Sequence, residues 1–209
     1  MPGDYLQILS TPSVRAAQAA HGSLALSSRV GSRPTEAVLT EVEREFIALR
    51  DSFYLATVSE SGWPYVQHRG GPPGFLRVLD DRTLAFADLR GNRQYLSVGN
   101  LAANDRAALF LMDYANRRRL KILARAEVRE LGDPAIAEAA SALAAGRGHP
   151  EGVMLLHVEA FAWNCPQHIT PRFTEAELGG LVATLRERVA VLERENQALI
   201  AQLAPQPRD

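Results

Sequence analysis

The chain has a single cysteine, Cys165, and no apolar run near the roughly 18 residues that a membrane-spanning helix needs. One cysteine excludes an intrachain disulfide framework and a cysteine-rich zinc site. The N-terminus has no basic region followed by an apolar block, so no secretory signal is visible. We therefore expect a cytoplasmic protein that does not bind a membrane.

An excess of charge of either sign is also missing. Lys and Arg together number 23 and Asp and Glu 24, so the formal net charge is −1. This balance provides no general attraction for nucleic acid or for an anionic membrane surface, and we expect neither partner. The hydrophobic share of 46% is ordinary for a soluble globular protein with a core of its own.

Several motifs of well-known catalytic sites are absent. The chain has no glycine-rich nucleotide loop, no His-Glu-x-x-His motif and no Gly-x-Ser-x-Gly motif. Its five histidines do not have the spacing of metal ligands, so we predict no metal site. No serine–histidine pair or close pair of carboxylates points to covalent catalysis. The sequence therefore assigns no catalytic residue.

The composition and hydrophobic pattern divide the chain into three main parts. Residues 1–35 are rich in Ser, Ala, Pro and Gly, and we interpret them as an arm on the surface or across a partner subunit. Residues 36–173 contain a helix followed by short β-like runs. A helix with a heptad pattern is predicted over residues 174–204, and residues 205–209 form a short tail.

The central part is predicted to be mainly β with peripheral helices, an α+β class. Thr40 and Glu43 form a capping box in a helix near residues 36–51, and Asp133 caps a helix that begins at Pro134. The apolar runs are short and lie about ten residues apart, which favours an antiparallel barrel over a doubly wound sheet. Strands are expected over residues 53–59, 65–69, 75–79, 83–87, 107–113, 120–130 and 152–163, and a further helix over 92–104.

The C-terminal helix has the clearest periodicity in the sequence. Residues recur every seven positions in two seams, which are Leu178, Leu185, Leu192 and Leu199 at heptad position d and Val182, Val189, Asn196 and Leu203 at position a. Val at a, Leu at d and one polar Asn at a favour a parallel two-stranded coiled coil. The alternative is an amphipathic helix that packs on the barrel.

Basic and amide side chains collect near strand ends in the central part. Residues 67–69 (Gln-His-Arg) end one predicted strand, and residues 88–95 lead from another strand into a predicted helix. The unpaired N–H groups and positive dipole end of that helix suit a phosphate near Asn92 and Arg93. Arg69 is placed to add a bidentate contact. The alternative is that these arginines are solvated surface charges.

Together these segments resemble the pyridoxamine 5′-phosphate oxidase-like family of FMN-binding split barrels. The resemblance covers about residues 36–173. It rests on the motifs GWPYVQHR (62–69), LAFADLRGNRQY (84–95), NDRAALF (104–110), LKILARAE (120–127) and WNCPQHITPR (163–172). It implies an antiparallel split β-barrel and a homodimer with two FMN sites at the subunit interface, each lined by both chains.

The resemblance also implies which residues bind the cofactor. The phosphate and ribityl chain would contact Arg69, Asn92, Arg93 and Gln94. The ring would lie beside Gln67 and His68, with Arg119 and Lys121 nearby. Trp163 and Asn164 would approach the ring from the other subunit. A cation near the N1 edge of the ring favours reduced flavin, and Lys121 or Arg119 is the candidate for this role.

The chain departs from authentic pyridoxamine phosphate oxidases at two motifs. Their Arg-x-Val-Leu-Leu-Lys strand is replaced here by QHRGGPPG (67–74), and their C-terminal Arg-x-His motif is missing. The resemblance therefore implies an FMN-dependent oxidoreductase whose substrate is not a B6 vitamer. Its small-molecule or electron-transfer partner is not indicated. The alternatives are a flavin-binding or electron-carrier protein without a substrate, a relative that binds deazaflavin or haem, and a coiled-coil interaction scaffold.

Overall fold

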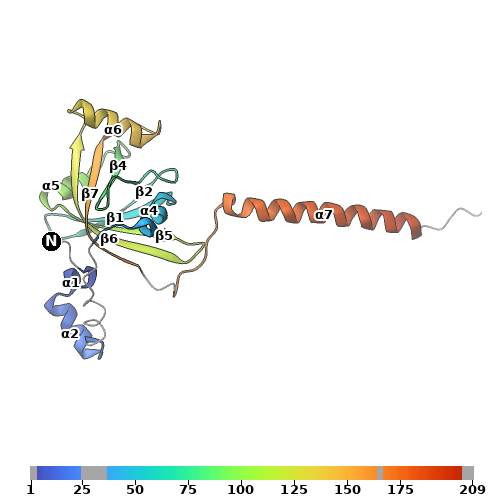
Figure 1. Ribbon diagram of the computed structural model, residues 1–209, viewed down its shortest axis with the longest axis horizontal. Helices are drawn as coiled ribbons and strands as arrows, with labels where there is room; N and C mark the ends of the chain where they lie inside the picture. The colour runs from blue at the N-terminus through green and yellow to red at the C-terminus, as the bar shows by residue number, and fades with distance from the viewer. Residues whose placement is uncertain (1–3, 25–36, 164–166, 204–209) are drawn as a thin grey trace, which may run out of the picture. The chain divides into compact units, whose positions relative to one another are not determined.

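The structure is a computed structural model that describes residues 4–24, 37–163 and 167–203 (Figure 1). Its contacts form two compact units. The first contains all of the described strands, and the second contains the long C-terminal helix. In the part of the chain that the structure describes, no helix combines the length and the apolar character needed to cross a membrane.

The first unit is built on one seven-stranded antiparallel sheet. The strands are β1 (Ser52–Val58), β2 (Pro64–Gly70), β3 (Arg77–Val78), β4 (Thr83–Leu89), β5 (Arg106–Asp113), β6 (Arg118–Glu130) and β7 (Pro150–Trp163). Their order is β2-β1-β5-β6-β7-β4-β3, and every pair of neighbours is antiparallel. Because β2 and β3 do not pair with each other, the barrel is open. This confirms the predicted antiparallel split architecture.

Five described helices belong to this unit. They are α1 (Tyr5–Leu9), α2 (Pro12–Ala20), α4 (Glu41–Ala48), α5 (Leu96–Ala103) and α6 (Pro134–Ala144). The two predicted caps are confirmed. The backbone N–H of Thr40 donates to Glu43 Oε2 at 3.0 Å, and Asp133 Oδ1 accepts the N–H of Ala135 at 2.8 Å. Each bond satisfies a backbone donor at a helix N-terminus, which is why these helices begin where they do.

The inner face of the sheet carries the core. On β1 the side chains of Phe53, Leu55 and Thr57 are buried while those between them are more exposed, as the two-residue period of a strand requires. Phe53 lies between two other rings, with centroids 5.6 Å from Phe75 and 5.4 Å from Phe86. These contacts draw the segment around β3 and the strand β4 toward β1, so the open sheet curls around its core.

Two predicted elements differ in the structure, and one further helix was not predicted. The strand expected over residues 75–79 is reduced to Arg77–Val78, and the arm also contains α1, which was not expected. The helix expected from residue 92 begins at Leu96. Arg93 and Tyr95 have positive φ angles of 60° and 51°, a conformation that a right-handed helix does not contain. Asn92 and Arg93 therefore lie in a loop before the helix and not in its first turn.

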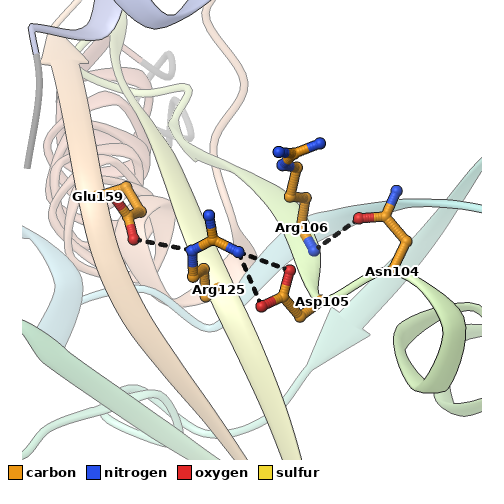
Figure 2. Close-up of polar contacts among 5 residues, drawn as sticks. All are labelled: Asn104, Asp105, Arg106, Arg125 and Glu159. Carbon is orange, nitrogen blue, oxygen red and sulfur yellow. Dashed lines mark hydrogen bonds and ion pairs between the residues drawn. The ribbon is translucent and has the colours of Figure 1, made fainter.

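The outer face of β1, β5 and β6 is partly covered by α1. Ile8 and Leu9 of this helix line an apolar hollow of about 430 Å³, together with Ala56, Ala108 and Leu123 of the three strands. An ion cluster lies at the edge of this hollow (Figure 2). In it, Arg125 pairs with Asp105 at 2.9 Å and with Glu159 at 3.1 Å.

The second unit contains α7 (Glu175–Leu203), which confirms the predicted C-terminal helix. The helix begins with a capping box that was not predicted from the sequence. The N–H of Thr174 donates to Glu177 Oε2 at 2.7 Å, and the N–H of Glu177 donates to Thr174 Oγ1 at 3.2 Å. Within the same unit, the guanidinium of Arg172 lies 4.9 Å from the ring centre of Tyr114.

Candidate functional site

Arg69 and Asp88 join two strands across the opening of the sheet. Arg69 lies on β2 and Asp88 on β4, strands that do not pair with each other, and Nη1 of Arg69 is 3.2 Å from Oδ1 of Asp88. The Arg69 side chain is only 15% exposed, and its guanidinium carbon lies 5.5 Å from the ring centre of Phe86. Its Nε is buried and has no hydrogen-bond partner among the described residues.

The unpartnered Nε is the most informative atom of the site. A buried donor without an acceptor costs about 1–3 kcal/mol, so native proteins rarely leave one without a function. The pKa of Asp88 is raised because burial disfavours its charged form, and the nearby Arg69 offsets only part of this effect. Asp88 therefore gives up its proton less readily than an exposed aspartate does.

The loop after β4 has an unusual backbone. Gly91, Arg93 and Tyr95 have positive φ angles of 49°, 60° and 51°, whereas Asn92 and Gln94 between them do not. Two N–H groups of this loop are satisfied within it, because the N–H of Arg93 donates to the Arg90 carbonyl at 3.2 Å and the N–H of Gln94 donates to Asn92 Oδ1 at 3.2 Å. Tyr95 is also the N-cap of α5 and makes no side-chain cap, so no side chain at this position occupies the first N–H groups of the helix.

Contacts to β7 hold this loop in place. Glu151 accepts hydrogen bonds from Arg90 Nε at 2.8 Å and from the Tyr95 hydroxyl at 3.0 Å, and the pKa of its carboxyl is lowered chiefly by the bond from Arg90. The positive charge of Arg90 is thereby paired with the carboxylate of Glu151. The Arg93 side chain is exposed and has no ion pair or hydrogen bond within the described residues, so its charge is available to a ligand.

The helix that follows the loop is fixed to the sheet by two side-chain hydrogen bonds. Ser97 Oγ donates to Gln67 Oε1 at 2.9 Å, and Asn100 Nδ2 donates to Thr57 Oγ1 at 3.0 Å. Because Ser97 is buried, the first of these bonds is shielded from water. It orients the Gln67 amide and leaves its NH₂ group as the remaining donor.

Two cavities meet at Gln67 and Arg69. The smaller, of about 60 Å³, lies between these side chains and loop 88–98. The larger, of about 210 Å³, extends from the same side chains along residues 68–72 to α6. The smaller cavity has polar walls and the size of a phosphate group, whereas Phe75, Phe86 and Leu143 give the larger one an apolar lining.

The structure brings together six of the ten predicted cofactor residues. Five line the smaller cavity, namely Gln67, Arg69, Asn92, Arg93 and Gln94. His68 lines the larger cavity, and its ring stands edge-on to Tyr54 with centroids 5.7 Å apart. The phosphate-binding part of the prediction thus corresponds to one contiguous surface. Asn164 lies outside the described residues.

Arg119 and Lys121 lie elsewhere, on the outer face of β6. Lys121 pairs in register with Phe110 of β5, and its ammonium is 4.8 Å from the ring centre of Tyr5 in α1. Burial and the neighbouring Arg119 lower the pKa of Lys121. Arg119 Nε is a second buried donor without a partner in the described part of the chain.

Trp163 also lies apart from the two cavities. Its indole N–H donates to Glu43 Oε1 at 2.7 Å, and its ring stands edge-on to Phe46 at 4.7 Å. The guanidinium of Arg118 covers the indole at 4.7 Å. These contacts connect the end of β7 to α4 within one chain and give Trp163 a structural role.

Asp88 and Ser97 belong to the site but were not predicted as site residues. Both are buried polar residues whose partners, Arg69 and Gln67, come from β2. The available signal for Asp88 was an acid at the end of an apolar strand, because a buried carboxylate needs a partner. Over the described ranges, no group of three or more His, Cys, Asp or Glu side chains is arranged to hold a metal ion.

An open antiparallel sheet whose edge strands β2 and β3 do not pair is the architecture of a split barrel. The family model of pyridoxamine 5′-phosphate oxidase matches residues 39–161, which is more than half of the chain. The chain therefore belongs to the pyridoxamine 5′-phosphate oxidase family, as the sequence motifs implied. No curated protein matches it.

Solved structures with similar folds come from several proteins. HupZ from Group A Streptococcus is 22% identical with a TM-score of 0.51, over 65% of this chain and 99% of that chain. An FMN-binding protein from Syntrophomonas wolfei is 13% identical with a TM-score of 0.46, over 72% and 97%. An F420 reductase is 21% identical with a TM-score of 0.43, over 59% and 98%. The likeness to HupZ shows that the two proteins share a fold.

Proposed function

We propose that this protein is an FMN-dependent oxidoreductase that acts as a homodimer on a substrate other than a B6 vitamer. The observation that carries the proposal is that Arg69 and the left-handed loop at residues 91–95 line the same small cavity. Guanidinium and amide side chains that line one small cavity are suited to a phosphate monoester. Membership of the pyridoxamine 5′-phosphate oxidase family makes FMN the natural source of that phosphate.

In this proposal the residues around the small cavity hold the phosphate and the ribityl chain. Arg69 and Arg93 provide positive charge, and Asn92 and Gln94 provide amide groups. Gln67, oriented by Ser97, provides a further donor. His68 and the apolar lining of the larger cavity border the ring. Bound FMN would supply the redox chemistry, while the chain orients it and limits its exposure to water.

The outer face of β1, β5 and β6 is the proposed subunit interface. Its apolar hollow is rimmed by charged residues, as interfaces commonly are. Arg119 and Lys121 lie on this face and would reach the flavin of the second subunit, with Asn164 as a further proposed contact. A cation there stabilises the negative charge of reduced flavin. Trp163 is not part of the proposed site, because its indole is engaged within its own chain.

A flavin carrier without a substrate is the second candidate. Among the described residues that line the two cavities, the one acid is Asp88, and it is paired with Arg69. The site thus offers no free carboxylic acid for proton transfer, which a simple electron carrier does not need.

The visible spectrum of the purified full chain tests the proposal first. We expect the absorption bands of oxidised flavin, or their appearance as bound flavin when FMN is added. Parallel titrations with riboflavin, F420 and haem identify the preferred cofactor. Steady-state turnover with nicotinamide donors then separates an oxidoreductase from a carrier. Absence of FMN binding in these titrations would contradict the proposal.

A further inference from the structure

The helix α7 exposes a continuous apolar seam. Six described seam residues are between 38% and 57% exposed, namely Leu178, Val182, Leu185, Val189, Leu192 and Leu199. Helices in proteins draw most of their stability from packing of an apolar face and not from intrinsic propensity. A seam of this length on a 29-residue helix therefore calls for a partner.

The spacing of the seam identifies the partner as another helix. The repeat is seven residues over the whole helix, or about 3.5 residues per turn, which is the period of a left-handed supercoil. A helix that packs on a globular body commonly shows a wider stripe with a period near 3.6. We propose that α7 forms a parallel, in-register, two-stranded coiled coil with α7 of a second copy of this chain. The proposal does not depend on flavin binding.

Three residues favour a second copy of the same helix in parallel. Asn196 at an a position would meet the Asn196 of the second copy, so each amide finds a partner inside the seam. Arg188 at g lies five residues before Glu193 at e, the spacing of an ion pair between parallel strands, and two-fold symmetry forms it twice. Neither side chain has an ion pair or hydrogen bond within the described part of the chain.

An antiparallel pair fits the sequence less well. Aligning the a and d layers of two opposed helices places Asn196 against Leu185, which leaves a buried amide without a partner. The same alignment places Arg188 against Glu195 and Arg186 against Glu193. The two orientations therefore differ in which charges meet, and substitution can distinguish them.

Disulfide formation in the full-length chain tests the orientation directly. In a Cys165→Ser background, Asn196→Cys should crosslink two copies rapidly under mild oxidation, because the two positions face each other in the seam. In an antiparallel pair these positions would be about 16 Å apart along the axis and would not crosslink. Glu187→Cys, at the outward f position, is the matched control and should crosslink slowly. Equal rates for the two variants, or no crosslink for Asn196→Cys, would overturn the proposal.

A charge exchange in the Asn196→Cys chain tests the register. Arg188→Glu places like charges opposite each other twice and should weaken the association of α7 by about tenfold, seen as slower crosslinking at low salt. Adding Glu193→Arg should restore the rate, because the pair reforms with reversed signs. In an antiparallel pair the double variant would meet Glu195 and Arg186 and stay repelled. Failure of this rescue would overturn the parallel register, whereas flavin content, read in the same samples, reports separately on the proposed function.

Discussion

Nη1 of Arg69 and Oδ1 of Asp88 lie 3.2 Å apart and connect strands β2 and β4, which have no backbone hydrogen bonds to each other. The ion pair thus bridges the opening of the split sheet. Nε of the same guanidinium is buried and has no hydrogen-bond partner among the described residues, and the Arg69 side chain also lines the smaller cavity. One arginine therefore joins two strands of the fold and borders the candidate site.

Replacing Arg93 tests the position of the phosphate. Arg93→Ala should weaken FMN binding by about tenfold or more, since a charged hydrogen bond contributes roughly 1.5–3 kcal/mol. Riboflavin binding should change little, because riboflavin has no phosphate. Fluorescence titration with both flavins measures the difference. Arg77→Ala, which removes an exposed arginine of β3, is the matched control. An equal loss for both flavins in Arg93→Ala would place the phosphate elsewhere.

The raised pKa of Asp88 predicts a pH-dependent stability. Burial lifts this pKa above its ordinary value of 3.8, so between 3.8 and the raised value the folded protein binds more protons than the unfolded chain. The contribution of Asp88 to the free energy of unfolding therefore falls as pH rises through this interval. Asp88→Asn removes the dependence, so its stability relative to the natural chain should improve as pH rises from 3.8 through the raised pKa of Asp88.

Urea unfolding of the flavin-free protein at several pH values measures this trend. The control is Asp81→Asn, which makes the same substitution at an exposed aspartate. A difference between Asp88→Asn and the natural chain that does not change with pH would show that the Asp88 pKa is not raised.

Lys121 is the only lysine of the chain, which makes its titration easy to observe. After reductive methylation with a ¹³C label, its signal is expected to titrate below the ordinary value of 10.5, since burial and Arg119 both disfavour the charged amine. Arg119→Gln should raise the pKa by removing the like charge. Tyr5→Ala should raise it by exposing the amine to water. An unchanged pKa in Tyr5→Ala would mean that α1 does not cover this face in solution.

Trp163 should matter for stability and not for flavin affinity. Trp163→Phe removes the indole N–H and leaves Glu43 Oε1 without that donor, at a cost of about 1–3 kcal/mol in the free energy of unfolding. The other tryptophan, Trp63, is 77% exposed, so Trp63→Phe is a matched control with little expected effect. Denaturant unfolding and FMN titration of both variants decide the matter. A large loss of FMN affinity in Trp163→Phe would show that Trp163 contributes to the cofactor site.

Local signals in the sequence determined the elements of this protein. The capping box at Thr40, the Asp133–Pro134 start of α6 and the heptads of α7 act over a few residues or one helix, so they were readable without a fold. The alternation of short apolar runs likewise predicted the antiparallel sheet. The motifs carrying Gln67, Arg69 and Arg93 predicted one side of the site, because each motif lies at the end of a strand.

The tertiary structure decided which of these side chains meet. Arg69 lies beside Asp88 because the contact between the core rings of Phe53 and Phe86 curls the sheet. Phe53 and Phe86 are far apart in the chain. The helix α5 begins at Leu96 and not at the predicted residue 92, because the hydrogen bonds of Arg90 and Tyr95 to Glu151 stabilise a left-handed loop before it. Long-range packing also placed Trp163 on Glu43 and Lys121 under Tyr5. Helix and strand propensities are local, whereas the partner of a buried charge is set by the whole fold.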